Sequence, residues 1–437
     1  MEVSADNSTL SSHAGLETYK LIMLNLTLSY QHRHMAKYGH RRKDMEKSEG
    51  EGMKSAYGLQ IPEPDPLLTR VGPGTPCGEL MRRYWQPVCL SADLNDLPKL
   101  VRILGEDLVA FRDGAGRAGL LFFRCSHRAT SLEYGRVEER GLRCCYHGWL
   151  YDVEGNILEM PLEPANNPFL RHIQHPCYPV REFGGLVFAY MGPLEKIPQF
   201  PLYDVWQRPG GTLKARMGPR VGGPVNCNWL QAEENLMDAL HTFWLHTRHS
   251  GAQFPSQTYG IDPEGLQYEE TDQGMRFLLK RRLGTGKWWE LVWEMIMPLN
   301  VHLVYTDEPK IERVRAVTYC VPIDDTHQLG ASIRWLPDNE VEMLSGREQL
   351  APGGRQNTSY EYTQRHPDDK EAVEGQGPIA LHGLEHLVTS DKGVMMFRAI
   401  LRQAIQAVER GKDPKGIFRD PAQAAFVATT AGSVVRD

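Results

Sequence analysis

Short apolar runs separated by polar residues dominate the chain between residues 100 and 195. Three such runs, each bounded by glycine or aspartate, are 101–104, 108–111 and 119–123. Several short strands at close spacing are typical of a small antiparallel β domain. A longer apolar run at 183–193 closes with a Gly-Pro pair, which predicts a buried strand followed by a turn. Prolines then cluster, so we place the end of this domain near residue 195.

The second half of the chain combines strand-like segments with one amphipathic helix. Strand-like segments occur at 275–283, 291–299, 301–306, 313–321 and 332–336. They predict an antiparallel sheet of about six strands. Near the C-terminus, before Gly411, a helical period of apolar residues is formed by Phe397, Ile400, Leu401, Ala404, Ile405 and Val408. The pattern indicates an α+β protein.

Composition and charge narrow the class of protein. The 437 residues are 41% hydrophobic and 24% charged, values typical of a globular chain with more than one domain. The net charge of −6 argues against nucleic acid as a partner. Residues 1–60 are polar and include a basic stretch at 40–43, so we predict a disordered extension there. The apolar run at 21–28 is too short to span a bilayer, which predicts a cytoplasmic protein without a membrane segment.

One group of cysteines and histidines stands out because of its spacing. Cys125 and His127 are followed, after sixteen residues, by Cys144 and His147, in the pattern C-x-H-x16-C-x-x-H. Two thiolates and two imidazoles on paired hairpin loops suit a [2Fe-2S] cluster with cysteines on one iron and histidines on the other. A tetrahedral zinc ion could use the same ligand types. The strand-rich surroundings favour the cluster.

A second candidate metal site lies at residues 234–246, E-N-L-M-D-A-L-H-T-F-W-L-H. Asp238 and His241 are three residues apart, so on a helix they share a face and could hydrogen-bond. His241 and His246 are five apart, and on a regular helix they would lie about 140° apart. Both reach one ion only where the helix is broken or contains a π-bulge, and such bulges favour functional sites. Taken alone, the two histidines fit buried structural residues equally well.

Together the two patterns resemble the oxygenase component of the Rieske non-heme iron oxygenases. The resemblance covers residues 62–415 and includes N-W-x-Q at 228–231. Stretches such as T-R-V-G-P-G-T-P, L-G-E-D-L-V-A-F-R-D and G-Q-G-P-I-A are similar to the branch of phthalate 4,5-dioxygenase and dehydrodivanillate O-demethylase. The resemblance implies an N-terminal all-β Rieske domain over 61–195 and a C-terminal helix-grip catalytic domain over 196–437, in which helices cover an antiparallel sheet. One departure is Ala129, where the family usually has glycine.

The same resemblance implies residues for each iron centre. The [2Fe-2S] cluster would be held by the first pattern, Cys125, His127, Cys144 and His147. A mononuclear Fe(II) would be held by His241, His246 and one carboxylate from D-D-K-E-A-V-E, where Asp369 aligns best and Asp368, Glu371 and Glu374 stay open. Asp238 corresponds to an aspartate that links an iron-binding histidine to a Rieske histidine of the neighbouring subunit. Asn235 corresponds to an asparagine close to the iron.

The implied activity is oxidation of an aromatic substrate with O2 by a terminal oxygenase. Electrons would come from NAD(P)H through a separate reductase and/or a ferredoxin, and would cross between subunits of a homotrimer. The branch suggests aromatic acids and methoxylated or otherwise substituted aromatics, and dihydroxylation, O- or N-demethylation and monohydroxylation share the same ligands. The alternative is a Rieske-type electron carrier with an appended binding domain, which needs no set of His241, His246 and Asp369.

Overall fold

The computed structural model describes residues 58–164, 167–218, 225–251, 260–261, 265–283, 285–302, 312–338 and 359–437. Contacts group the residues from Pro62 to Asp437 into one compact unit. The extension predicted at 1–60 lies almost wholly outside the described residues. The division of this unit at residue 195 stays a prediction. In the described ranges, no helix has the length and apolar character needed to cross a bilayer.

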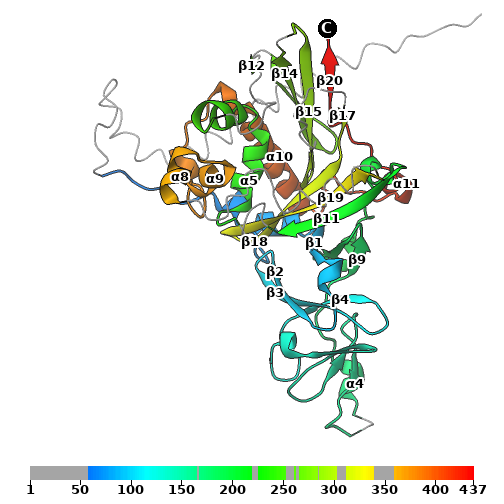
Figure 1. Cartoon of the computed structure of the whole chain (residues 1–437). Coiled ribbons are helices and arrows are strands. Elements are labelled where there is room, and N and C mark those ends of the chain that lie inside the picture. The colour runs from blue at the N-terminus through cyan, green and yellow to red at the C-terminus, as the bar shows by residue number, and fades with distance from the viewer. Residues whose placement is uncertain are drawn as a thin grey trace, which may run out of the picture. The chain divides into compact units, whose positions relative to one another are not determined.

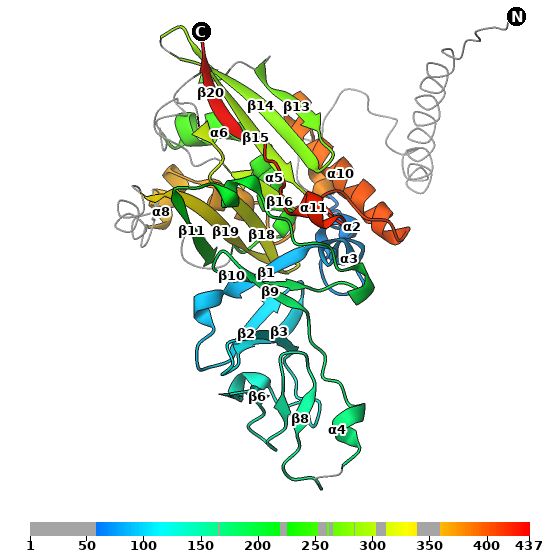
Figure 2. The same cartoon turned by 90° about the vertical axis from the view of Figure 1, so that its right-hand side faces the viewer.

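The chain between residues 99 and 159 forms two small antiparallel sheets (Figures 1 and 2). One has the strand order β2-β3-β4 and the other β5-β6-β7-β8. The strands are β2 (Lys99–Ile103), β3 (Glu106–Arg112), β4 (Ala118–Phe122), β5 (Arg136–Glu138), β6 (Gly141–Arg143), β7 (Leu150–Tyr151) and β8 (Ile157–Glu159). Fully buried Phe111, Leu121 and Tyr151 belong to a core that both sheets share. The small β domain expected from the short alternating runs is confirmed.

A third sheet, of order β1-β10-β9, connects this part to the rest of the unit. Its strands are β1 (Trp85–Leu90), β9 (Val180–Phe183) and β10 (Leu186–Tyr190). All five residues of β10 are buried, as the apolar run predicts. Phe188 of β10 packs against Tyr319 of the large sheet, with ring centroids 5.6 Å apart. The third sheet and the large sheet therefore share one hydrophobic core.

A ten-stranded sheet, antiparallel throughout, fills the second half of the described chain. Its main path has the order β11-β19-β18-β16-β15-β14-β12. In addition, β13 pairs with β14, and β20 pairs with both β15 and β17. The strands are β11 (Gly211–Gly218), β12 (Gly260–Ile261), β13 (Gln267–Glu270), β14 (Gly274–Arg282), β15 (Trp288–Ile296), β16 (Leu299–His302), β17 (Glu312–Arg313), β18 (Ala316–Asp324), β19 (His327–Pro337) and β20 (Gly432–Arg436). The prediction of about six strands was wrong. The additional strands are very short, like β12 and β17, or only partly buried, like β11 and β20.

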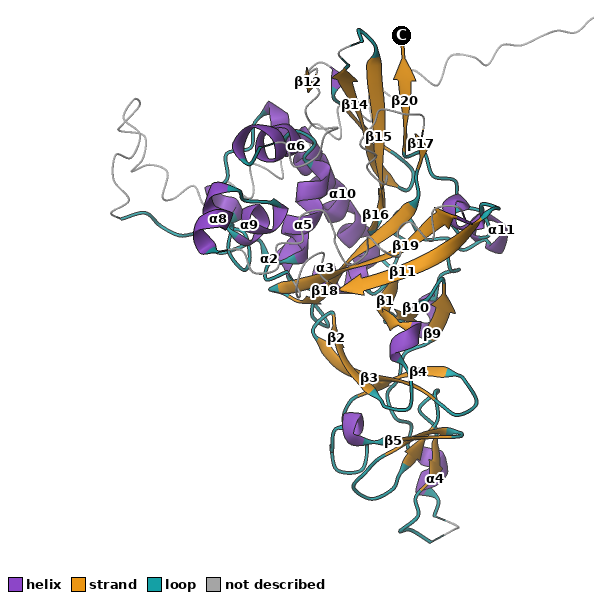
Figure 3. Ribbon diagram, viewed as in Figure 1, coloured by secondary structure: helices purple, strands orange, loops and turns teal. Residues whose placement is uncertain are grey.

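Helices gather on one side of the large sheet (Figure 3). The longest, α10 (Lys392–Glu409), buries the predicted apolar face and packs Phe397 against Trp229 at 6.4 Å between ring centroids. A Cβ at Gly393 would lie 2.3 Å from the Met237 carbonyl oxygen, so glycine permits the close approach of α10 to the end of α5. The α-helices are α2 (Pro66–Thr69), α3 (Pro76–Met81), α4 (Phe169–His172), α5 (Trp229–Met237), α6 (His241–Phe243), α8 (Tyr360–Arg365), α9 (Asp369–Glu374), α10 and α11 (Pro421–Ala424).

Single turns of 3-10 helix connect many of these elements. They are η2 (Ser91–Asp93), η3 (Leu132–Tyr134), η4 (Leu194–Lys196), η5 (Asp204–Gln207), η9 (His382–Leu384) and η10 (Thr389–Asp391). One further helical segment, Trp244–His249, is a π-helix that directly continues α6. With helices covering one antiparallel sheet, the predicted α+β class is confirmed.

Candidate functional site

Two tight loops carry the first group of ligand residues. The loop after β4 holds Cys125 and His127, and the Ala129 N–H donates to the Cys125 carbonyl at 2.9 Å. The loop after β6 holds Cys144 and His147, and the Gly148 N–H donates to the Cys144 carbonyl at 3.2 Å. The two imidazole rings lie 4.4 Å apart between centroids. Both loops therefore bring their ligands to one place.

The cysteines of this group are buried, whereas His127 is exposed and His147 is half-buried. Cys125 and Cys144 are 4% and 3% exposed, whereas His127 is exposed and stacks on Trp149 at 4.8 Å. A tetrahedral zinc site needs all four donor atoms within about 4 Å of one another. Among the described residues, two groups of metal-binding side chains meet a limit of 4.8 Å, and this quartet is neither of them. Separate cysteine and histidine ends fit a [2Fe-2S] cluster better than one zinc ion.

Hydrogen bonds stabilise Cys125 as a thiolate. The bond from the Cys144 side chain lowers the pKa of Cys125 to about 5, against the effect of burial, and the Tyr151 hydroxyl contributes to the same shift. Tyr151 Oη lies 3.0 Å from Cys125 Sγ. Burial raises the pKa of Tyr151, so its hydroxyl stays protonated and donates a hydrogen bond to the sulfur. Hydrogen bonds to cluster sulfurs are among the factors that set the reduction potential of an iron–sulfur centre.

Ala129, in the first cluster loop, has a φ of 58°. This left-handed conformation costs an alanine roughly 1–2 kcal/mol. The loop thus keeps the conformation that glycine would favour, at the cost of strain.

Ala129→Gly is expected to raise the free energy of unfolding by up to about 1 kcal/mol, because glycine relieves the strain but loses more entropy on folding. Urea unfolding monitored through the cluster absorbance measures the change. Ala115→Gly, in an exposed turn outside the left-handed region, is the matched control and is expected to be destabilising. A loss of stability at Ala129 equal to that at Ala115 would contradict the strain argument.

The second group of ligands lies where a regular helix ends. Helix α5 stops at Met237, and Asp238 follows in an extended conformation. The chain then re-enters a helix at His241 and continues as the π-helix that contains His246. The broken, π-helical geometry expected from the five-residue spacing is therefore present. It turns both imidazoles toward α9, where the acidic stretch begins.

The two histidines meet at a single carboxylate oxygen. His241 Nε2 lies 3.3 Å and His246 Nε2 lies 3.1 Å from Asp369 Oδ1. Burial alone would raise the pKa of Asp369, but hydrogen bonds from the two histidines hold it well below the ordinary value. These three side chains form one of the two candidate metal-binding groups among the described residues. Two imidazoles and one ionised carboxylate are the donor set of mononuclear non-heme iron sites.

The other acidic residues of this stretch have different partners. Asp368 is the N-cap of α9 and accepts from the Asp369 N–H at 2.9 Å. Glu371 completes the capping box by accepting from the Asp368 N–H at 2.7 Å. Glu374 accepts from the Asn226 N–H at 2.9 Å. Geometry therefore favours Asp369 among the four carboxylates considered from the sequence.

Asp238 and Asn235 contact the ligands in ways that the sequence predicts only in part. His241 Nδ1 donates to the backbone carbonyl of Asp238 at 2.5 Å, whereas the Asp238 carboxylate lies 3.8 Å from that nitrogen. The expected carboxylate–histidine hydrogen bond is thus replaced by a carbonyl bond, because Asp238 lies outside the helix. Its carboxylate instead accepts from the Leu240 N–H at 3.0 Å. Asn235 Nδ2 donates to Asp369 Oδ1 at 3.2 Å.

Gln231 joins the two helices of the site and was not singled out from the sequence. Its side chain, 2% exposed, donates to the carbonyls of Val373 and Gly377 at 2.8 and 3.0 Å. It also accepts from the Ala380 N–H at 3.0 Å. These bonds hold the C-terminal end of α9 to α5. Its place in the N-W-x-Q motif was the only mark of Gln231 in the sequence, because its partners lie about 150 residues further along the chain.

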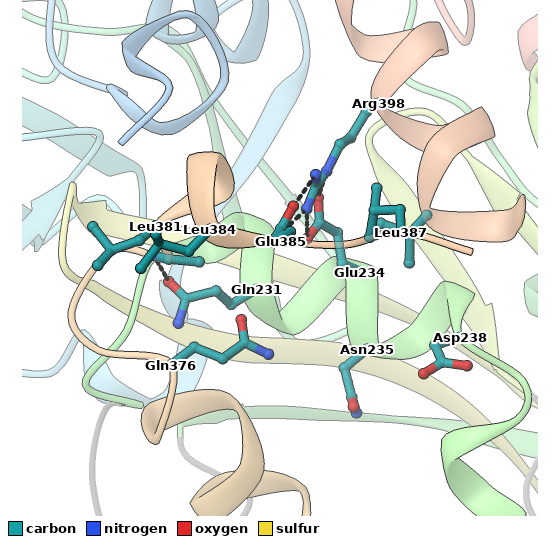
Figure 4. A pocket seen from close by; sticks show the side chains of 12 residues that line it. Gln231, Glu234, Asn235, Asp238, Gln376, Leu381, Leu384, Glu385, Leu387 and Arg398 are labelled. Carbon is teal, nitrogen blue, oxygen red and sulfur yellow. Dashed lines mark hydrogen bonds and ion pairs between the residues drawn. The ribbon is translucent and has the colours of Figure 1, made fainter. Parts of the chain in front are cut away.

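A pocket of about 410 Å³ lies beside α5 (Figure 4). Asn235 and Asp238 line it, and Asn235 also bonds Asp369, so the pocket adjoins the candidate site of His241, His246 and Asp369. Arg398 of α10 makes four hydrogen bonds of 2.5–2.9 Å to Glu234 and Glu385 at its other side. The second candidate metal-binding group, Glu234, His382 and Glu385, therefore already has a guanidinium between its two carboxylates. Burial raises the pKa of Glu234, and Arg398 opposes that shift.

Arg398→Met is expected to lower the free energy of unfolding by about 3–5 kcal/mol, because Glu234 would keep a buried carboxylate without its guanidinium partner. Urea unfolding measures the change. The matched control is Arg365→Met, which removes an ion pair with Glu361 in which both side chains are more than two-thirds exposed. That variant is expected to change stability little. Equal losses of unfolding free energy in the two variants would show that burial does not strengthen the ion pairs of Arg398.

Comparison with known proteins agrees with both centres. The Rieske [2Fe-2S] domain family matches residues 84–180. The chain is 42% identical over 383 residues to phenoxybenzoate dioxygenase subunit alpha of Ectopseudomonas oleovorans, covering 85% of this chain and 91% of that protein. It is also 42% identical over 359 residues to the tert-butanol monooxygenase / tert-amyl alcohol desaturase oxygenase subunit of Aquincola tertiaricarbonis, covering 77% and 76%.

A more distant relative and a solved structure complete the comparison. The phthalate 4,5-dioxygenase oxygenase subunit of Pseudomonas putida is 33% identical over 399 residues, covering 82% of this chain and 89% of that protein. The terminal oxygenase of carbazole 1,9a-dioxygenase from Nocardioides aromaticivorans has the same fold, with a TM-score of 0.53 at 19% identity, covering 78% and 98%. The chain belongs to the Rieske non-heme iron oxygenases and is an oxygenase subunit of that family.

Proposed function

We propose that the mononuclear Fe(II) of this oxygenase is held by His241, His246 and Asp369. The observation that carries the proposal is the convergence of both Nε2 atoms on Asp369 Oδ1, at 3.1 and 3.3 Å. This donor set leaves coordination positions for O2 and substrate. When bound, the iron supplies O2 activation, and the cluster held by Cys125, His127, Cys144 and His147 supplies electrons.

Neighbouring side chains and carbonyls prepare the three ligands. The Asp238 carbonyl accepts a hydrogen bond from the Nδ1–H of His241, so Nε2 is the nitrogen that would bind a metal. The Asn235 amide fixes the orientation of the Asp369 carboxylate. Gln231 holds α9 in place. The chain thereby orients its ligands before a metal binds.

The electron path is proposed to cross between chains of a homotrimer. Figure 3 shows the small sheet that includes β5 at the opposite end from α5 and α9, so one chain does not bring its own cluster to its own mononuclear site. Exposed His127 suits contact with a second chain, and the Asp238 carboxylate lines a pocket on α5 where such a contact could form. The chain would receive electrons from NAD(P)H through a reductase and/or a ferredoxin. A cytoplasmic location stays a prediction.

The substrate is proposed to be an aromatic acid or a substituted aromatic. Phe277 and Trp293 stack at 6.1 Å on neighbouring strands β14 and β15. On the same face of β14, Arg281 is 2% exposed and donates to Thr242 Oγ1 at 3.2 Å, one residue after His241. A buried guanidinium beside the iron-binding helix suits a carboxylate-bearing substrate. A tertiary alcohol is the second candidate, because one relative of equal identity is named for that class.

Single turnover of the reduced, Fe(II)-loaded protein distinguishes the two substrate classes. The protein is mixed with ¹⁸O2 and either a phenoxybenzoate, phthalate or tert-butanol, and the products are analysed by mass spectrometry. Labelled product from an aromatic acid and none from tert-butanol is expected. Labelled product from tert-butanol alone would replace the aromatic proposal with the tertiary-alcohol one. Arg281→Met should lower turnover of the acids and leave that of an uncharged aromatic ether unchanged.

A further inference from the structure

A fully buried histidine lies next to the Rieske cluster loops but is not one of the four ligands. His175 is 0% exposed. The segment around it is held on two sides, because Cys177 pairs with Leu121 of β4 and Gln174 pairs with Asn156. The His175 N–H also donates to the Gly155 carbonyl at 2.9 Å. A buried polar side chain at such a position needs an explanation, because burial of an imidazole is costly unless both ring nitrogens are bonded.

Both ring nitrogens of His175 are bonded, and the partners fix the tautomer. Nε2 lies 2.8 Å from the Phe122 carbonyl oxygen, which only accepts, so the Nε2–H donates there. Burial lowers the pKa of His175, so the ring is neutral. Nδ1 is then the acceptor, and the Ser126 hydroxyl donates to it at 2.7 Å. Ser126 is the residue between the ligands Cys125 and His127.

The ring of His175 also contacts the tyrosine that donates to the cluster sulfur. The rings of His175 and Tyr151 lie 4.5 Å apart between centroids. Tyr151 Oη lies 3.0 Å from Cys125 Sγ. His175 therefore contacts both sides of this hydrogen bond: the donor through ring packing, and the acceptor segment through Ser126.

We propose that His175 is a positioning residue that sets the reduction potential of the Rieske cluster by holding the Tyr151 hydroxyl on Cys125 Sγ. Reduction adds negative charge to the cluster, and a hydrogen bond to sulfur stabilises that charge. The bond is sensitive to geometry, because hydrogen bonds weaken steeply as distance and angle depart from their optimum. A residue that fixes both partners thus acts on the potential without touching the iron. The proposal rests on the cluster alone and is independent of the substrate.

The test compares midpoint potentials of the full-length holoprotein by anaerobic redox titration. Tyr151→Phe deletes the donor directly, and His175→Phe keeps a ring against Tyr151 but removes both ring hydrogen bonds. His172→Phe, on exposed α4 in the same part of the chain, is the matched control. Acid-labile sulfide per chain and the EPR spectrum of the reduced cluster confirm that each variant retains an intact cluster.

Both single variants at residues 151 and 175 are expected to shift the potential to more negative values, and the control is expected to leave it unchanged. The double variant should be no more negative than Tyr151→Phe, because the two residues act through one hydrogen bond. A wild-type potential in His175→Phe, or fully additive shifts, would overturn the proposal. If His175→Phe fails to fold, Ser126→Ala removes the same link to the ring. It should reproduce the negative shift, and an unchanged potential there would equally overturn the proposal.

Discussion

Asp369→Ala is expected to lower the affinity of the protein for mononuclear Fe(II) by more than about 100-fold and to leave the Rieske cluster intact. Loss of a residue that only supports a metal ligand already costs about 10–100-fold. Asp369 is proposed as a ligand itself, and both histidine Nε2 atoms converge on its Oδ1. Fe(II) titration of the anaerobic protein measures the affinity. Cluster absorbance and acid-labile sulfide provide the internal standard.

Asp368→Ala is the matched control, one residue away. Asp368 caps α9, and loss of an N-cap costs about 0.5–2 kcal/mol of stability. Its Oδ1 lies 3.7 Å from His246 Nδ1, outside hydrogen-bond distance. We therefore expect a small loss of stability and a much smaller effect on Fe(II) affinity than at Asp369. A larger loss of Fe(II) affinity in Asp368→Ala than in Asp369→Ala would assign the ligand to Asp368.

Gln231→Leu is expected to lower Fe(II) affinity by about 10–100-fold, although Gln231 is not proposed to touch the metal. The substitution leaves the carbonyls of Val373 and Gly377 and the Ala380 N–H without their buried partner. Each such unsatisfied group costs about 1–3 kcal/mol. The cost falls on the end of α9, the helix whose first residue is Asp369. Fe(II) titration and urea unfolding measure the two effects.

Gln376→Leu separates this effect from a change in the pocket itself. Gln376 lines the same pocket as Gln231, but it is exposed. Its replacement is expected to leave Fe(II) affinity within about twofold of the wild type. Equal losses in the two variants would mean that the polarity of the pocket, rather than the bonds from Gln231 to α9, controls iron binding.

The residues proposed to bind iron were the part of the site that the sequence could predict. Metal chemistry restricts both the residue type and its spacing, so Cys125, His127, Cys144 and His147 stand out in the sequence as one group. The same reasoning predicted the π-helix, because His241 and His246 cannot meet on a regular helix. Asp369 was harder to choose, since its neighbours are also acidic. The N-cap role of Asp368 and the partners of Glu371 and Glu374 separate them only in three dimensions.

Supporting contacts and weakly patterned strands were not predictable in the same way. Gln231 and His175 act through partners distant in sequence or through backbone groups, and such bonds leave no local pattern. Asp238 was expected to bond His241 through its carboxylate, but the break after α5 presents its carbonyl instead. The large sheet exceeds the prediction because β11 is half-exposed and β20 pairs from the far C-terminus. Pairing with β15, which is distant in sequence, makes residues Gly432–Arg436 a strand.

Iron and acid-labile sulfide per chain, measured on wild-type protein purified anaerobically and saturated with Fe(II), test the central claim most directly. A Rieske cluster and a mononuclear site in one chain predict about three irons and about two sulfides. About two irons with two sulfides, and no further iron bound after saturation, would contradict the assignment of His241, His246 and Asp369 to an iron site. That result would favour a Rieske-type electron carrier with an appended binding domain.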